Sequence, residues 1–187
     1  MLRVVIDTSC LVSYVLTQGD LMSRVVAHWR AGTFVVLSSP ATRAELAGVL
    51  ARPAIQRLAV ATLDELVRGL ERFSEHVPGA LNLSGVCRDP KDDKFLACAA
   101  EGEAHYLVSS DRDLLDLRHY RDGAIVNPGQ FLLALELHPL DADAMAARFG
   151  SDVLADIRAN VPLEPGTAAR VVEALALLCS DGGCDEP

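Results

Sequence analysis

Short runs of β-branched and apolar residues, separated by stretches with helical patterning, constrain the fold of this chain more than any other feature. The runs lie at residues 3–6, 34–37, 106–108 and 124–126. Each has the length and composition of a strand that is buried on both faces, as strands of parallel sheets are. Strands that alternate with helices in this way predict an α/β fold with a largely parallel central sheet flanked by helices.

The stretches between the strands carry helix start and stop signals. Ser39-Pro40 is a typical start, and Gly32 and Gly102 are typical stops. Thr62, with Glu65 three positions later, predicts a capping box. Helices are therefore expected at residues 21–31, 41–51, from Thr62 onward, at 92–101, at Leu114–Leu117 and from Pro128 onward.

The composition changes beyond Pro139, where the chain becomes rich in alanine and acidic. Residues 139–187 hold nine acidic and three basic side chains, a net charge of −6, whereas residues 1–138 have a net charge of −3. The acidity argues against broad electrostatic binding of nucleic acid but does not exclude RNA. We expect a domain at 1–138, a helical C-terminal extension at 139–180 (helices at 141–149, 152–160 and 168–179), and a disordered tail at 181–187.

The chain has no pattern of a secreted or membrane protein. The N-terminus has no basic leader followed by a long apolar stretch, and no segment reaches the length of a membrane helix. The five cysteines are odd in number and lack zinc-like spacing, so buried thiols are expected rather than disulfides or structural zinc. These features predict a cytoplasmic protein without a membrane partner. The cysteines are Cys10, Cys87, Cys98, Cys179 and Cys184.

Four acidic residues occupy positions that a parallel sheet would bring together. Asp7 and Asp111 each follow a strand, and the carboxyl ends of parallel strands share one edge of the sheet. Glu45 lies inside the helix after the second strand, and Asp93 lies in the first turn of the 92–101 helix. Neighbouring carboxylates repel one another unless a cation neutralises them, and Mg²⁺ or Mn²⁺ suits oxygen ligands. The pattern favours metal-assisted hydrolysis of phosphodiesters.

The segments around these acids resemble the motifs of PIN-domain proteins in order and spacing. The resemblance covers about residues 2–135 and is closest to the toxin components of toxin–antitoxin systems, the VapC-like ribonucleases. The segments are Ile6-Asp7-Thr8-Ser9, Ala44-Glu45-Leu46, Asp89-Pro90-Lys91-Asp92-Asp93-Lys94-Phe95-Leu96 and Val108-Ser109-Ser110-Asp111-Arg112-Asp113-Leu114-Leu115.

The resemblance implies a fold and a function. It implies a PIN-like three-layer fold and an endoribonuclease that uses Mg²⁺ or Mn²⁺ on single-stranded or structured RNA, as a homodimer with an antitoxin protein as partner. Ser109 would lie near the site as a hydroxyl group. Ser9 stands where the family often has Asn, and its hydroxyl can still bond a site carboxylate. The catalytic and metal-binding acids implied are Asp7, Glu45, Asp93 and Asp111.

Several alternatives remain open at this stage. Asp93 is chosen over Asp92 because the apolar positions of its helix set the buried face beside it. Asp111 competes with Asp113, which could instead cap the short helix that follows. Arg43, Lys91, Lys94 and Arg112 could contact phosphates or be ordinary surface charges.

Two other functions compete with the nuclease. A PIN fold could act as a binding module that is catalytically weak or inert. A phosphohydrolase with an aspartate nucleophile is disfavoured, because Asp7-Thr8-Ser9 lacks a second acid two residues after the first.

Overall fold

The computed structural model describes residues 1–58 and 60–137 of the chain, which divides into two compact units, Met1–Pro128 and Gly129–Pro187. Within the described residues of the first unit, six strands form one sheet in the order β3-β2-β1-β4-β6-β5. All neighbouring strands are parallel except β5, which is antiparallel to β6. The strands are β1 (Leu2–Ile6), β2 (Phe34–Ser38), β3 (Ser74–His76), β4 (Tyr106–Val108), β5 (His119–Tyr120) and β6 (Gly123–Val126).

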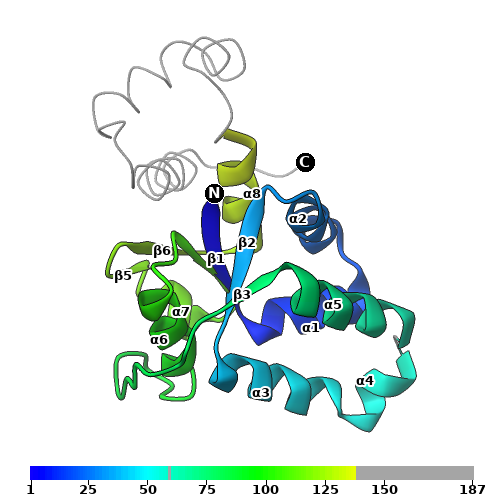
Figure 1. Cartoon of the computed structure of the whole chain (residues 1–187), viewed down its shortest axis with the longest axis horizontal. Helices are drawn as coiled ribbons and strands as arrows, with labels where there is room; N and C mark the ends of the chain where they lie inside the picture. Colours follow the sequence, from blue (N-terminus) through cyan, green and yellow to red (C-terminus); the bar gives the residue numbers. More distant parts are fainter. Residues whose placement is uncertain (59, 138–187) are drawn as a thin grey trace, which may run out of the picture. The chain divides into compact units, whose positions relative to one another are not determined.

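Helices cover both faces of this sheet (Figure 1). The helices α2 and α5 contact β2 on one face, and α6 packs on β1, β2 and β4 from the other. The helix α3 contacts both α1 and α6, and so lies at the edge where the chain leaves β1 and β2. The helices of this unit are α1 (Thr8–Thr17), α2 (Asp20–Arg30), α3 (Pro40–Leu50), α4 (Pro53–Leu58), α5 (Val60–Phe73), α6 (Asp93–Glu101) and α7 (Arg112–Leu115).

The pleat of the strands divides the core into two layers. Val5, Leu37 and Leu107 are in register on one face, where they pack with Phe95 and Leu96 of α6. Alternate residues point to the opposite face, and they are also apolar and buried. This two-sided burial explains why the strands appear in the sequence as continuous apolar runs rather than as an alternating pattern. The expected α/β fold with a largely parallel sheet and flanking helices is confirmed.

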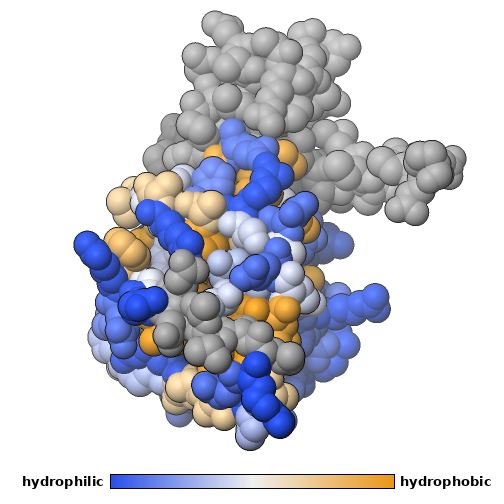
Figure 2. All heavy atoms as spheres, turned by 90° about the vertical axis from the view of Figure 1, so that its right-hand side faces the viewer, coloured by the Kyte–Doolittle hydropathy of each residue, from blue (hydrophilic) through white to orange (hydrophobic). Residues whose placement is uncertain are grey.

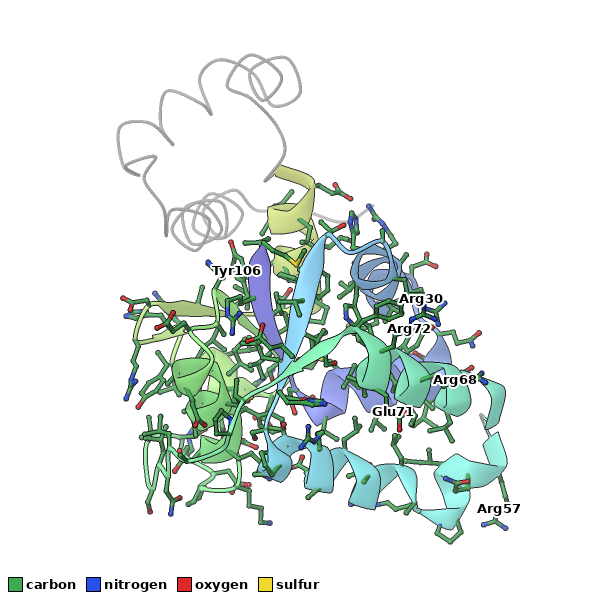
Figure 3. All side chains as sticks on the ribbon, in the orientation of Figure 1. Arg30, Arg57, Arg68, Glu71, Arg72 and Tyr106 are labelled. Carbon is green, nitrogen blue, oxygen red and sulfur yellow. The ribbon has the colours of Figure 1, made fainter. Side chains whose placement is uncertain are left out.

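The helix α5 packs closely on α2 at a glycine. A Cβ atom on Gly69 would lie 3.2 Å from the ring of Trp29, which itself donates a hydrogen bond to the carbonyl of Phe73. The outer side of these helices carries charged side chains, including Arg30, Arg68 and Arg72 (Figure 3), and hydrophobic atoms are interspersed among polar ones on this face (Figure 2).

Some sequence-based boundaries were wrong. Thr62 does not cap a helix: α5 begins at Val60, and the Thr62 hydroxyl instead accepts a hydrogen bond from Gln18 at 2.7 Å. The short helix α7 begins at Arg112, before the predicted Leu114, because Asp111 supplies its cap. The short edge strands β3 and β5 and the helices α1 and α4 had not been predicted.

The helix α8 (Pro128–Leu137) starts at the predicted proline, and its residues 129–137 are all that the structure describes of the second unit. The predicted helices at 141–149, 152–160 and 168–179, and the tail at 181–187, lie outside the described residues. Within residues 1–58 and 60–137, none of the helices combines the length and apolar character that crossing a bilayer requires. The cysteines of this part of the chain, Cys10, Cys87 and Cys98, are free and buried.

Candidate active site

Asp7 lies where β1 passes into α1, at the carboxyl edge of the sheet. Its backbone N–H donates to the carbonyl of Val108 at 2.9 Å, which extends the pairing of β1 with β4 by one bond. Its Oδ1 accepts from the N–H of Ser9 and caps α1, while Oδ2 accepts the hydroxyls of Ser9 at 2.6 Å and Ser109 at 2.7 Å. Asp7 is only 5% exposed. Three donors therefore hold a buried carboxylate in one orientation.

Ser109 connects Asp7 to the next acid along the sheet edge. It follows β4, is fully buried, and accepts a hydrogen bond from the N–H of Asp111 at 2.9 Å while it donates to Asp7. Asp111 caps α7, because its Oδ1 accepts from the N–H of Asp113 at 2.7 Å. The Ser109 hydroxyl thus donates a hydrogen bond to Asp7 and accepts one from the backbone of Asp111.

The side chains of the neighbouring residues Asp92 and Asp93 have different environments in the structure. Asp93 is 2% exposed, and its carboxylate accepts the backbone N–H groups of Gly85 at 2.6 Å, Val86 at 3.4 Å and Cys87 at 2.7 Å. Gly85 has a positive φ of 74°, which favours glycine in this turn. Asp93 therefore ties the long connection after β3 to the start of α6.

Asp92 has the environment that the sequence analysis had assigned to Asp93. Its side chain makes no capping hydrogen bond to α6. Burial first, and then the negative charges of Asp111, Asp7 and Asp89, raise the pKa of Asp92 to about 6. These charges act on Asp92 because the acids lie near one another. The sequence analysis chose Asp93 over Asp92; in the structure the Asp93 carboxylate accepts three backbone N–H groups, whereas the carboxyl of Asp92 is the one influenced by the charges of Asp7 and Asp111.

A tight turn positions Asp92. Oδ1 of Asp89 accepts from the N–H of Lys91 at 2.9 Å, and the carbonyl of Asp89 accepts from the N–H of Asp92 at 3.0 Å. The Asp-Pro pair is a recognisable turn signal. The sequence analysis did not predict that the charge of Asp89 would act on Asp92, although the Asp89-Pro90 pair indicated a turn at this position.

Glu45 lies in α3, which starts at a capping box between Ser39 and Thr42. Its carboxylate forms an ion pair with the ammonium of Lys94, on α6. The exposed fractions of the two side chains are 28% for Glu45 and 25% for Lys94. The pair joins two helices that both begin at the carboxyl edge of the sheet. Lys94 is therefore engaged by a predicted site acid.

The other predicted site residues lie on the surface or in other contacts. Arg43, Lys91 and Arg112 are exposed. Asp113 forms an ion pair with Arg88, 3.1 Å from its Oδ1, and does not cap a helix. Among the described residues, no group of three or more His, Cys, Asp or Glu side chains already has the geometry to hold a metal ion. The candidate acids therefore lie in one region of the protein, but their side chains are not arranged as the ligands of a bound metal ion.

The donor set nevertheless fits a hard divalent cation. Asp7, Asp92 and Asp111 offer carboxylate oxygens, the ligands that Mg²⁺ and Mn²⁺ prefer. Their mutual repulsion is what a bound cation would relieve.

The fold and this region define the class of the protein: an α/β protein with acidic side chains at the carboxyl edge of a mostly parallel sheet. The chain belongs to the PIN-domain family, whose model, described as PIN domain, matches residues 3–113. The match covers more than half of the 187 residues and includes all four predicted site acids. PIN domains are in general nucleases that act on nucleic acid, usually with divalent metal ions. No curated protein matches the chain significantly.

Proposed function

We propose that this protein is a divalent-metal-dependent endoribonuclease whose site comprises Asp7, Asp92, Asp111 and Glu45. The observation that carries the proposal is the position of Asp7, which is buried, oriented by two hydroxyls, and near enough to Asp92 to influence its charge. Membership in a family of nucleases supports hydrolysis of a phosphodiester. In this proposal Asp92 takes the role that the sequence analysis gave to Asp93.

Each acid would make a different contribution. Asp7 would be the fixed ligand, because its carboxylate is held by Ser9 and Ser109. Asp92 and Asp111 would complete the set from neighbouring elements, and Glu45 would join it from α3. A divalent cation held by these acids supplies a Lewis-acidic centre that orients a phosphate and favours ionisation of water.

The basic side chains around the acids could hold the RNA backbone. Arg43, Lys91 and Arg112 are exposed on the segments that carry the site acids. Guanidinium and ammonium groups pair with phosphates, and these contacts carry no base specificity. The net charge of −9 predicts that binding relies on this local set rather than on a broad basic surface.

The proposal predicts that Asp7→Asn abolishes metal-dependent cleavage of single-stranded RNA. The substitution keeps the shape of the side chain but removes the charge of the fixed ligand, so the rate should fall roughly 100-fold or more. Rates with Mn²⁺ and with chelator would be measured on a labelled RNA. Asp116→Asn is the matched control, because Asp116 pairs with Arg88 on the surface, and it should cleave at the wild-type rate. Equal activity of wild type and Asp7→Asn contradicts the proposal and favours an inert binding module.

We further propose that the ribonuclease is a VapC-like toxin that acts as a homodimer and is neutralised by an antitoxin protein. The support is the order and spacing of the four acidic motifs. Expression of the wild-type chain should arrest growth of a bacterial host, and expression of Asp7→Asn should not. Growth arrest by both forms, or by neither, contradicts the toxin proposal.

A further inference from the structure

Lys94 lies among the acids of the candidate site and is held there by two contacts. Its ammonium forms the ion pair with Glu45, which joins α6 to α3. Its Nζ also lies 5.6 Å from the centroid of the Phe95 ring, within the range of a cation–π contact. Lys94 is only 25% exposed. The Lys94 side chain is therefore partly shielded from solvent.

Lys94 also follows Asp92 by only two residues in the chain. Its ion pair with Glu45 thus brings one ammonium between α3 and the start of α6, where the candidate acids Glu45 and Asp92 lie. A divalent cation bound by the same acids would occupy the electrostatic role that this ammonium fills.

We propose that Lys94 is a built-in counter-ion that competes with the divalent cation for Glu45, so that binding of the cation displaces its ammonium. The inference rests on the proposed metal site. While no cation is bound, Lys94 neutralises the charge of Glu45. When a cation binds, the ion pair with Glu45 breaks. The affinity for the cation is lower than the acids alone would give.

The choice of basic residue fits this role. Lys91 and Lys94 are the only lysines in a chain with 17 lysine and arginine residues. A guanidinium binds a carboxylate through two parallel hydrogen bonds, whereas an ammonium is a compact charge on a flexible stem. A lysine can therefore release Glu45 with a small movement of its own side chain.

Cation affinity of substituted proteins tests the competition. Mn²⁺ binding to the full chain would be measured by calorimetry for wild type, Lys94→Met, Lys94→Arg and Lys91→Met. Lys94→Met removes the competitor and should bind Mn²⁺ about three- to tenfold more tightly, because one nearby positive charge is lost. Lys91→Met removes an exposed charge from the same segment and should change the affinity less than twofold. Lys94→Arg keeps the charge and should not tighten binding.

The wild-type protein offers a second measurement. Because the chain has two lysines, a protein labelled with ¹³C-lysine gives one Cε signal for each. Saturating Mg²⁺ should shift the signal of Lys94 and leave that of Lys91 in place. The single substitution of each lysine assigns the two signals.

Each outcome decides between the alternatives. Unchanged or weaker Mn²⁺ binding by Lys94→Met overturns the competition, since a lysine that merely positions Glu45 would help the cation bind. A Lys94 signal that does not move when Mg²⁺ saturates the protein overturns it as well. If the wild-type chain binds no divalent cation, the proposed metal site fails together with this inference. Wild-type binding without the Lys94 effect overturns the inference alone.

Discussion

Two hydroxyls converge on a single oxygen of Asp7, one from the next turn of the chain and one from the neighbouring strand. Ser9 donates from inside α1, only two residues away, and Ser109 donates from the end of β4. A carboxylate that accepts two such bonds cannot rotate freely. Ser9 stands where PIN proteins often have Asn, and its hydroxyl makes the hydrogen bond that was expected of it.

Substitution of Ser9 or Ser109 should disturb the orientation of the Asp7 carboxylate without removing its charge. Ser109→Ala leaves Asp7 with one hydroxyl donor, and the rate of RNA cleavage should fall about tenfold, the lower range for loss of a group that supports a metal ligand. Loss of the buried bond should also cost about 1 kcal/mol of the free energy of unfolding. Ser9→Ala should lower the rate similarly. The rate would be followed at saturating Mn²⁺, and stability by urea denaturation.

A serine away from Asp7 provides the control for this prediction. Ser23→Ala removes a hydroxyl that bonds the carbonyl of Gln18 on the surface, and it should leave the rate unchanged. If Ser109→Ala cleaves at the wild-type rate, the hydroxyl does not orient a functional Asp7.

At the scale of elements, the start of α6 depends on contacts with the connection that precedes it. The segment between β3 and α6 has no regular secondary structure, and acidic side chains hold it through its backbone. Glu101 accepts from the N–H groups of Gly79 at 2.8 Å and Ala80 at 2.9 Å, and Asp93 accepts three more. Together they fix the turn from which Asp92 projects.

Asp92→Asn and Asp93→Asn should therefore impair different properties, metal binding in the first case and stability in the second. Asp93→Asn leaves one oxygen for several buried N–H groups, so the free energy of unfolding should fall by about 2 kcal/mol, while Mn²⁺ still binds to the folded protein. Asp92→Asn should weaken Mn²⁺ binding at least tenfold without a comparable loss of stability. Calorimetry and thermal denaturation measure the two properties. If Asp93→Asn, folded, loses Mn²⁺ binding while Asp92→Asn retains it, our assignment of these residues is wrong.

At the scale of the whole molecule, the negative charge of Asp92 reduces stability in the metal-free protein. A carboxyl group whose pKa is raised on folding binds its proton more tightly in the folded state. Its contribution to stability is therefore favourable at low pH and declines as the pH rises from about 4 toward 6. The pKa of Asp92, raised to about 6, places the loss in this window.

Asp92→Asn should accordingly stabilise the metal-free protein at pH 7.5. The gain should be about 1 kcal/mol, since Asp92 is only partly buried and water screens much of the repulsion. Near pH 4 the advantage of the variant should disappear. Melting temperatures in the presence of chelator, measured from pH 4 to pH 8, test the prediction. A variant that is less stable than wild type at pH 7.5 contradicts it.

The sequence by itself determined the class of fold and the region of the candidate site. The continuous apolar runs at 3–6, 34–37 and 106–108 predicted strands buried on both faces, and such strands belong to parallel sheets. Asp7 and Asp111 directly follow two of these strands, so the edge that they share followed from topology. The short edge strand β3 has only three residues and a polar sequence, Ser-Glu-His, and it carried no apolar signal.

Only the tertiary structure decided what the two adjacent aspartates and Lys94 contact. In the sequence Asp92 and Asp93 are equivalent acids at a helix start, and the apolar pattern of α6 favoured Asp93. The decision depends on the backbone N–H groups of residues 85–87, which the fold brings to Asp93. Glu45 and Lys94 are 49 residues apart, and no local pattern joins them. Contacts between separate elements depend on how helices pack, and that packing is a property of the whole chain.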